Sequence, residues 1–202
     1  MMIRPMLFNN EMVRAILEGR KTVTRRIVKP QLKREEGKWD WRAVIGETPI
    51  RYRPGDILYV RETYCKNYFD ESFPGYRNGG LRGNRNAYKA DYRKDIVGDV
   101  VPEPKWSPSI HMPKEAARIW LKVTDVGVER LQDITNLEAK KEGVICETDN
   151  SGQMHRRKFI SLWDSTIKKS DLGLYGWAAN PWVWVIKFER CEKPEGEDEK
   201  EM

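Results

Sequence analysis

The segment that most constrains the fold is Trp182-Val-Trp-Val-Ile-Lys-Phe188, close to the end of the chain. β-Branched and aromatic residues in such a run favour an extended strand. Successive residues of a strand point to opposite faces, and both faces of this segment are apolar as far as Lys187. Because a strand of this kind needs cover on both sides, we expect a central strand inside a small barrel rather than an exposed edge.

The remaining elements are short and mixed in type. Capping residues, helical spacing of apolar side chains and terminal glycines predict helices over residues 10–19, 135–142 and 157–165. Strands are expected directly after the turn at residues 20–22, over 57–61 and over 118–128. Residues 28–54 and 63–115 show no sustained period and are interpreted as two long loop insertions. We therefore predict one mixed α/β (α+β) domain over residues 1–191, with short helices at the rim of the barrel.

Charge divides unevenly along the chain. The whole sequence has 37 basic and 31 acidic residues, a net charge of +6. Residues 192–202 contain six acidic side chains and two lysines, and are expected to form a disordered acidic tail. Residues 1–191 therefore hold 35 basic and 25 acidic residues, a net charge of +10. A body this basic favours a polyanionic partner such as nucleic acid, although solubility alone is the alternative explanation.

Cysteine, histidine and hydropathy patterns argue against several other classes of protein. Cys65, Cys146 and Cys191 are far apart and match neither zinc-finger nor redox spacing. Only two histidines are present, His111 and His155, so we expect neither a metal nor another cofactor. The sequence has no run of eighteen apolar residues and no signal-peptide core. We expect a cytoplasmic protein with no membrane partner.

A cationic turn follows the first predicted helix and is the first candidate for a functional surface. It has seven basic residues in fifteen positions: Arg20, Lys21, Arg25, Arg26, Lys29, Lys33 and Arg34. Such a run on a turn and strand is suited to phosphate contact, and a solvated loop is the simpler alternative. Thr22 and Thr24 share a strand face with Arg26, so hydroxyl and cationic groups alternate there.

Glu142 is the second candidate because its position is electrostatically unfavourable. Thr135 and Glu138 have the spacing of a capping box, which predicts where the helix starts. Glu142 lies at the other end, where the helix dipole opposes a negative charge, and four residues after Glu138. This placement tends to raise the carboxyl pKa and would suit a proton donor. An ordinary surface glutamate is the alternative.

Further candidates lie in the predicted loops and at a strand end. Trp106 and other loop aromatics beside a basic surface can stack on nucleobases or cover the open ends of a barrel. His111, in Ile-His-Met-Pro, can act as a base or donate a hydrogen bond to a substrate, or be structural. Arg61 and Glu62 follow the strand over 57–61 and can line the mouth of a pocket or serve surface roles.

Four motifs in the same order resemble an ASCH domain, a member of the PUA-like β-barrel superfamily. They are Ile16-Leu-Glu-Gly-Arg-Lys-Thr-Val-Thr-Arg-Arg26, Pro54-Gly-Asp-Ile-Leu-Tyr-Val-Arg-Glu62, Glu138-Ala-Lys-Lys-Glu-Gly143 and the closing strand. Phe-Asn-Asn-Glu-Met-Val-Arg-Ala-Ile-Leu near the start and Pro-Ser-Ile-His-Met-Pro in the middle are similar to the longer ASCH proteins of phages and prophages. The resemblance implies a PUA-like β-barrel and a basic cleft that binds RNA or a modified nucleoside.

One branch of that family removes the acetyl group from 4-acetylcytidine. The resemblance places its catalytic lysine and threonine at Lys21 and Thr24, and its glutamate at Glu142. In that chemistry the threonine attacks the amide carbonyl, the lysine takes the hydroxyl proton and the glutamate protonates the leaving amine. Positions 21 and 24 differ in parity, so Lys21 has to lie in the turn for the two side chains to converge.

Three functions remain open at this point. The first is an RNA- or nucleotide-binding protein whose basic cleft accommodates a nucleobase. The second is an amidohydrolase acting on acylated cytidine-type nucleosides, and the third is a phage-encoded module that binds an undetermined protein. The expected ligand-binding residues are Arg20, Arg25, Arg26, Arg61, Glu62, Trp106 and His111.

Overall fold

The computed structural model describes residues 1–29, 31, 51–69, 85–92, 103–146 and 154–194. The strands are β1 (Ile3–Leu7), β2 (Val23–Ile27), β3 (Ile57–Arg61), β4 (Tyr64–Phe69), β5 (Arg85–Tyr88), β6 (Trp120–Arg130) and β7 (Trp182–Cys191). The α-helices are α1 (Asn10–Leu17), α4 (Asn136–Lys141), α5 (Met154–Thr166) and α6 (Leu172–Tyr175). Short 3-10 turns are η2 (Ser109–His111), η3 (Lys114–Ala116), η4 (Leu131–Asp133), η5 (Lys169–Asp171) and η6 (Trp177–Ala179).

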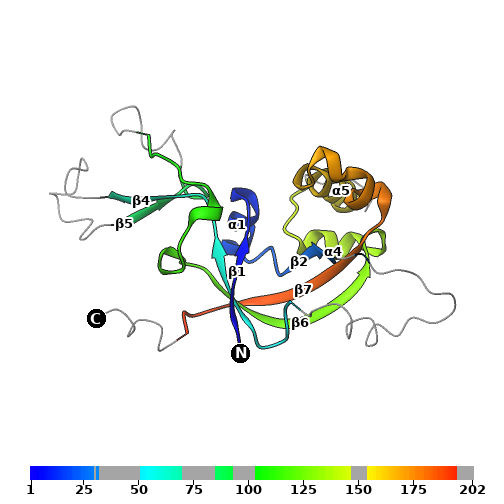
Figure 1. Cartoon of the computed structure of the whole chain (residues 1–202), viewed down its shortest axis with the longest axis horizontal. Coiled ribbons are helices and arrows are strands. Elements are labelled where there is room, and N and C mark those ends of the chain that lie inside the picture. The colour runs from blue at the N-terminus through cyan, green and yellow to red at the C-terminus, as the bar shows by residue number, and fades with distance from the viewer. Residues whose placement is uncertain (30, 32–50, 70–84, 93–102, 147–153, 195–202) are drawn as a thin grey trace.

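Five of the strands form one sheet in the order β1-β3-β6-β7-β2. β1 and β3 are parallel, and the other neighbours are antiparallel. β6 and β7 pair from Trp120 opposite Cys191 to Arg130 opposite Trp182, with a register shift between Val123 and Asp125. Figure 1 shows these two strands as long curved ribbons, with α4 and α5 at one end and the β4–β5 hairpin at the other. The mixed α/β class predicted from the sequence is confirmed.

β7 is apolar on both faces because each face packs against a different core. Trp184, Ile186 and Phe188 belong to the main core, which also contains residues of β1, α1, β3 and β6. Val183 points to the opposite face and packs in a second core with residues of α4 and α5. The two-sided apolar pattern therefore reflects two hydrophobic cores, one on each side of the strand.

The sheet of the described strands is not closed into a barrel, in contrast to the sequence prediction. β1 and β2 form its two edges, and the contact described between them is a side-chain hydrogen bond from Arg26 Nη2 to the Leu7 carbonyl oxygen, 2.6 Å long. The physical reason for the error is that α4 and α5 cover the second face of β7, so barrel closure is not needed to bury it.

The two predicted insertions differ in how far the structure describes them. In residues 28–54, positions 30 and 32–50 lie outside the described residues. In residues 63–115 the described part contains β4 and β5, which form a separate two-stranded antiparallel sheet. Most of the acidic tail, residues 195–202, also lies outside the described residues. In the described chain, none of the helices has the length and apolar character needed to cross a membrane.

Candidate functional site

The turn after α1 docks against the end of α4. Gly19 ends α1 with φ +72°, and the Arg20 and Lys21 amides both donate to the Ala15 carbonyl oxygen, at 2.8 and 2.9 Å. The Thr22 amide then donates to the Lys141 carbonyl oxygen at 3.0 Å. Lys21 and Glu142 form an isolated antiparallel bridge. Segments more than a hundred residues apart are thus joined through their backbones.

Gly143 allows this close approach. It has φ +88°, a conformation that side chains with a Cβ rarely adopt. A Cβ at this position would lie 2.6 Å from the Ala15 Cβ and 3.0 Å from the Lys21 Cβ. The glycine after Glu142 is therefore required both by the backbone turn and by the contact with α1.

Lys21 and Glu142 form a buried ion pair. Lys21 Nζ lies 2.5 Å from Glu142 Oε2 and also donates to the Glu142 carbonyl oxygen at 3.0 Å. The exposed fractions of the two side chains are 0% and 4%. Burial lowers the pKa of Lys21 from its ordinary value, while the Glu142 carboxylate acts in the opposite direction. The amine is therefore easier to deprotonate than an exposed lysine.

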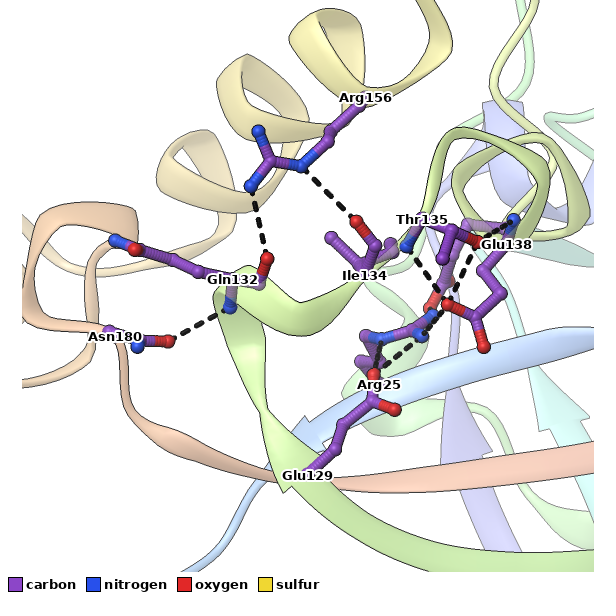
Figure 2. Close-up of polar contacts among 9 residues, drawn as sticks. Arg25, Glu129, Gln132, Ile134, Thr135, Glu138, Arg156 and Asn180 are labelled. Atoms are coloured by element: carbon purple, nitrogen blue, oxygen red, sulfur yellow. Dashed lines mark hydrogen bonds and ion pairs between the residues drawn. The ribbon is translucent and has the colours of Figure 1, made fainter. Parts of the chain in front are cut away.

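Arg25 binds the other oxygen of Glu142 and connects it to two more carboxylates. Its Nη1 donates to Glu142 Oε1 at 3.2 Å, and its Nε donates to Glu129 Oε1 at 2.8 Å. Arg25 Nη2 lies 3.4 Å from Glu138 Oε2, the oxygen that also accepts from the Thr135 amide. Figure 2 shows Arg25 between Glu129 and Glu138. Arg25 was expected to bind a ligand, but its guanidinium is enclosed by these acids.

Glu142 therefore has two cations to offset its position at the helix end. From the sequence, the helix dipole and Glu138 are its expected electrostatic neighbours. In the structure, each of its carboxylate oxygens contacts a basic side chain, Lys21 on one and Arg25 on the other. These contacts remove the reason for treating Glu142 as an acid made unusual by the dipole.

Thr24 lies in β2, opposite Ile186 of β7, and is buried. Lys21 lies before the start of β2, as the parity argument required. Within the described part of the chain, the Thr24 hydroxyl makes no hydrogen bond to Lys21 or Glu142. The structure thus brings two of the three expected catalytic residues into direct contact.

A first hollow, of about 610 Å³, lies between α1, the end of α4 and α5. We call it the helical hollow, and its charged lining residues are Glu11, Arg14, Glu18, Arg20, Glu142 and Lys158. Three cations and three anions balance each other, and Arg20 is bound to Glu18 and to the Gly143 carbonyl oxygen. The basic cleft implied by the resemblance is therefore not formed where the cationic turn meets the end of α4.

A second hollow, of about 620 Å³, lies between the two edge strands of the sheet. We call it the basic hollow, and its lining residues are Arg4, Pro5, Met6, Leu7, Arg26, Ile27, Lys29, Arg51, Tyr52 and Trp184. Among these residues, which are those of the described ranges, four are cations and none is a carboxylate. Both its volume and its combination of apolar walls with a few polar groups are typical of ligand sites.

The four cations of the basic hollow are held in place mainly by neutral groups. Arg26 lies over the Phe8 ring, with its Cζ 5.1 Å from the ring centroid, besides donating to the Leu7 carbonyl oxygen. Lys29 Nζ lies 4.7 Å from the centroid of the Tyr175 ring. Arg4 Nε is 3.9 Å from Asp56 Oδ2, longer than a hydrogen bond. Burial lowers the pKa of Arg26; Tyr52 and Glu142 oppose this shift, and repulsion from Arg51 adds to it.

The remaining predicted ligand-binding residues lie around the β4–β5 side of the molecule. Arg61 donates to the Ile110 carbonyl oxygen, and His111 is exposed in η2. Trp106 packs edge-to-face on Tyr92, with ring centroids 5.3 Å apart. None of these residues is among those that line the two hollows.

Glu62 has a structural role that the sequence did not indicate. Its carboxylate is fully buried and binds Arg118 through both oxygens, at 2.9 and 3.1 Å. Burial raises the pKa of Glu62, while Arg118 opposes the shift. The same guanidinium binds Asp91 and lies 4.0 Å from the centroid of the Tyr88 ring. This network fixes the β4–β5 hairpin to the start of β6 rather than forming the mouth of a pocket.

The sequence did not indicate most members of the basic hollow, and three of these are Arg4, Arg51 and Tyr52. Arg4 lies before the first predicted element, and Arg51 and Tyr52 lie in the predicted insertion over 28–54. Arg4 lies far from residues 51 and 52 in the sequence, and the tertiary fold brings all three to one hollow. Lys29 belongs to the cationic run that was already a candidate for phosphate contact.

No group of three or more histidine, cysteine, aspartate or glutamate side chains in the described ranges is arranged to hold a metal ion.

No family model matches the chain, and no curated protein matches it. Among solved structures, the chain is similar to an ASCH domain from Lactobacillus crispatus JV V101, with 12% identity, a TM-score of 0.42, and coverage of 94% of this chain and 79% of that one. It is also similar to the hypothetical protein PH0355, with 13% identity, a TM-score of 0.39, and coverage of 94% and 100%. Likeness at this level assigns neither an activity nor a site residue to this chain.

Proposed function

We propose that this protein is an RNA- or nucleotide-binding protein of the ASCH type, and that the basic hollow is its ligand site. The observation that carries the proposal is the lining of that hollow: within the described part of the chain it has four cations, two aromatic side chains and no carboxylate around about 620 Å³. Cations supply phosphate contacts, and aromatic rings supply a surface on which a base can stack.

The charge of the chain supports the same site. Residues 1–191 carry +10, but many of their cations face carboxylates, as in Lys21–Glu142, Arg25–Glu129 and Arg118–Glu62. The basic hollow is different because no acid is among the lining residues that the structure describes. The two hollows are similar in volume, so charge rather than size distinguishes them as sites for a polyanion.

Salt dependence of RNA binding tests this proposal. Each phosphate contact made to a single strand releases counterions and adds about −0.7 to the slope of log K against log salt. Three or four contacts therefore give a slope of about −2 to −3. The assay is fluorescence anisotropy of a labelled single-stranded RNA over a range of potassium chloride concentrations.

Arg51→Ala is the informative variant because Arg51 is exposed, so its removal leaves the core intact. We expect weaker binding and a slope smaller in magnitude by about 0.7 to 1. Lys140→Ala is the matched control, since it removes one exposed charge from α4, away from the basic hollow. Equal binding by the wild type and Arg51→Ala would exclude the basic hollow as the phosphate site.

A second candidate function is the hydrolysis of an acylated base amide, favoured by the buried Lys21–Glu142 pair. Thr24 Oγ1 would attack the acyl carbonyl carbon while the neutral Lys21 amine takes the hydroxyl proton. The proton that Lys21 takes from Thr24 would pass to Glu142 Oε2, 2.5 Å from Lys21 Nζ, and from there to the departing exocyclic amine, leaving the acyl group as an ester on Thr24. Water then hydrolyses that ester and releases the acid. The lowered pKa of Lys21 suits it to accept the proton.

Release of cytidine from 4-acetylcytidine, followed by chromatography, tests this second candidate. The Thr24→Val variant keeps the shape of the side chain but lacks the nucleophile, so activity is expected to be lost. Thr22→Val makes the same chemical change at an exposed position two residues away and should retain activity. If wild type and Thr24→Val release cytidine at the same rate, this mechanism is wrong.

A further inference from the structure

The basic hollow concentrates more charge than an internal phosphate needs. Its cations come from four separate places: β1, β2, the residues just after β2 and the residues just before β3. A groove that follows a strand of RNA would present cations along a track, roughly one for each phosphate. Here they converge on a single hollow instead.

Repulsion among these cations is a second sign of a compact anion. Arg26 and Arg51 line the same hollow, and repulsion from Arg51 contributes to lowering the pKa of Arg26, while Tyr52 and Glu142 act in the opposite direction. The contacts described for Arg26, Lys29 and Arg51 are with a carbonyl oxygen and aromatic rings, and these leave the net positive charge in place. A multiply charged anion in the hollow would relieve this repulsion.

We infer that the basic hollow binds a terminal phosphate group, either of a free nucleotide or of a 5′-phosphorylated RNA. This inference rests on the proposed function and specifies which part of the ligand the site recognises. An internal phosphodiester carries one negative charge, whereas a terminal phosphate monoester carries about −1.5 to −2 at pH 7. A terminal di- or triphosphate carries more, in a volume that four converging cations can surround.

The walls of the hollow provide a place for the rest of the nucleotide. Tyr52 and Trp184 line it together with Pro5, Met6 and Leu7. Tyr52 and Trp184 are largely buried, so the parts that reach the hollow are held rigidly. The cations therefore bind the phosphate end, while the apolar and aromatic side contacts the sugar and base.

The test compares three RNA oligonucleotides of one sequence, bearing a 5′-hydroxyl, a 5′-monophosphate or a 5′-triphosphate. Binding is measured by anisotropy in EDTA, so that magnesium does not screen the phosphates. We expect the protein to bind the 5′-triphosphate RNA about tenfold or more tightly than the 5′-hydroxyl RNA, because the cations of the hollow form hydrogen bonds with the charged phosphates. A nucleoside triphosphate and inorganic tripolyphosphate serve as competitors. Competition by the nucleoside triphosphate shows that a free nucleotide is a sufficient ligand. If neither competitor displaces the triphosphorylated RNA, a strand is needed.

The Lys29→Gln and Arg51→Gln double variant is expected to lose the preference for the phosphorylated end, because both side chains are exposed and line the hollow. Lys140→Gln is expected to keep it. Equal binding of the three oligonucleotides, reduced in the double variant, would overturn this inference but leave the proposed function standing. A preference that persists in the double variant would overturn the inference as well. If no oligonucleotide or nucleotide binds, both are wrong.

Discussion

Substitution of Gly143 tests the contact that brings the cationic turn and the end of α4 together. Gly143→Ala adds a Cβ that would lie 2.6 Å from the Ala15 Cβ and 3.0 Å from the Lys21 Cβ. The left-handed backbone costs about 1–2 kcal/mol for a residue with a Cβ. Overpacking adds about 1–3 kcal/mol. We therefore expect a loss of about 2–5 kcal/mol in the free energy of unfolding.

Gly55→Ala is the matched control. Gly55 has the same φ of +88°, but a Cβ there has no neighbour within 4 Å. The control should lose only the conformational cost of about 1–2 kcal/mol. Urea denaturation followed by tryptophan fluorescence gives both free energies. Equal losses in the two variants would show that the turn and α4 are not packed as closely as the structure has them.

Three further predictions concern charged side chains. Glu142→Gln removes the partner of two buried cations and should cost about 3–5 kcal/mol of stability in urea denaturation; a loss below about 1 kcal/mol would contradict the buried network. Asp125→Asn breaks an ion pair with Lys187 in which both side chains are 57% exposed, so the same assay should show a change of less than about 1 kcal/mol. The pKa of Lys21 is lowered in the folded state. Between that lowered pKa and the ordinary value of 10.5, the unfolded chain therefore binds more protons than the folded chain. Stability should therefore increase with pH in that window, and Lys21→Met should lack this increase when unfolding is measured at several pH values.

Elements with local signals were predictable from the sequence. Asn9 caps α1 through its side chain, and Thr135 and Glu138 form the expected capping box of α4. β1 and β4 were missed for different reasons. β1 is a five-residue edge strand with Pro5 inside it, which weakens any strand signal. β4 pairs with β5 across a long stretch of sequence without a period.

Barrel closure was predicted from the burial of both faces of one strand, and this inference was too strong. The pattern in Trp182–Phe188 specifies that both faces are covered but not what covers them. In the structure, Trp184 packs in the main core and Val183 packs with α4 and α5. A helical layer and a closed sheet give the same alternation, so local sequence alone does not distinguish them.

The candidate site was predictable only where residues are close in sequence or carry a motif. The resemblance pointed to Lys21 and Glu142, which are in contact. Arg25 lies in the same motif, but its partners Glu129 and Glu138 come from β6 and α4, so its enclosure depends on tertiary structure. Arg4 and Arg51 both line the basic hollow although they lie far apart in the sequence. Spacing in the sequence does not show that they are neighbours in the fold.

Photo-crosslinking tests the central claim, that the basic hollow holds the nucleotide, most directly. A single-stranded RNA containing 4-thiouridine is irradiated with the protein, and the crosslinked peptides are identified by mass spectrometry. We expect crosslinks at Tyr52 and Trp184, the aromatic residues of the basic hollow. Crosslinks confined to Tyr92 and Trp106, the aromatic pair on the β4–β5 side, would contradict the account.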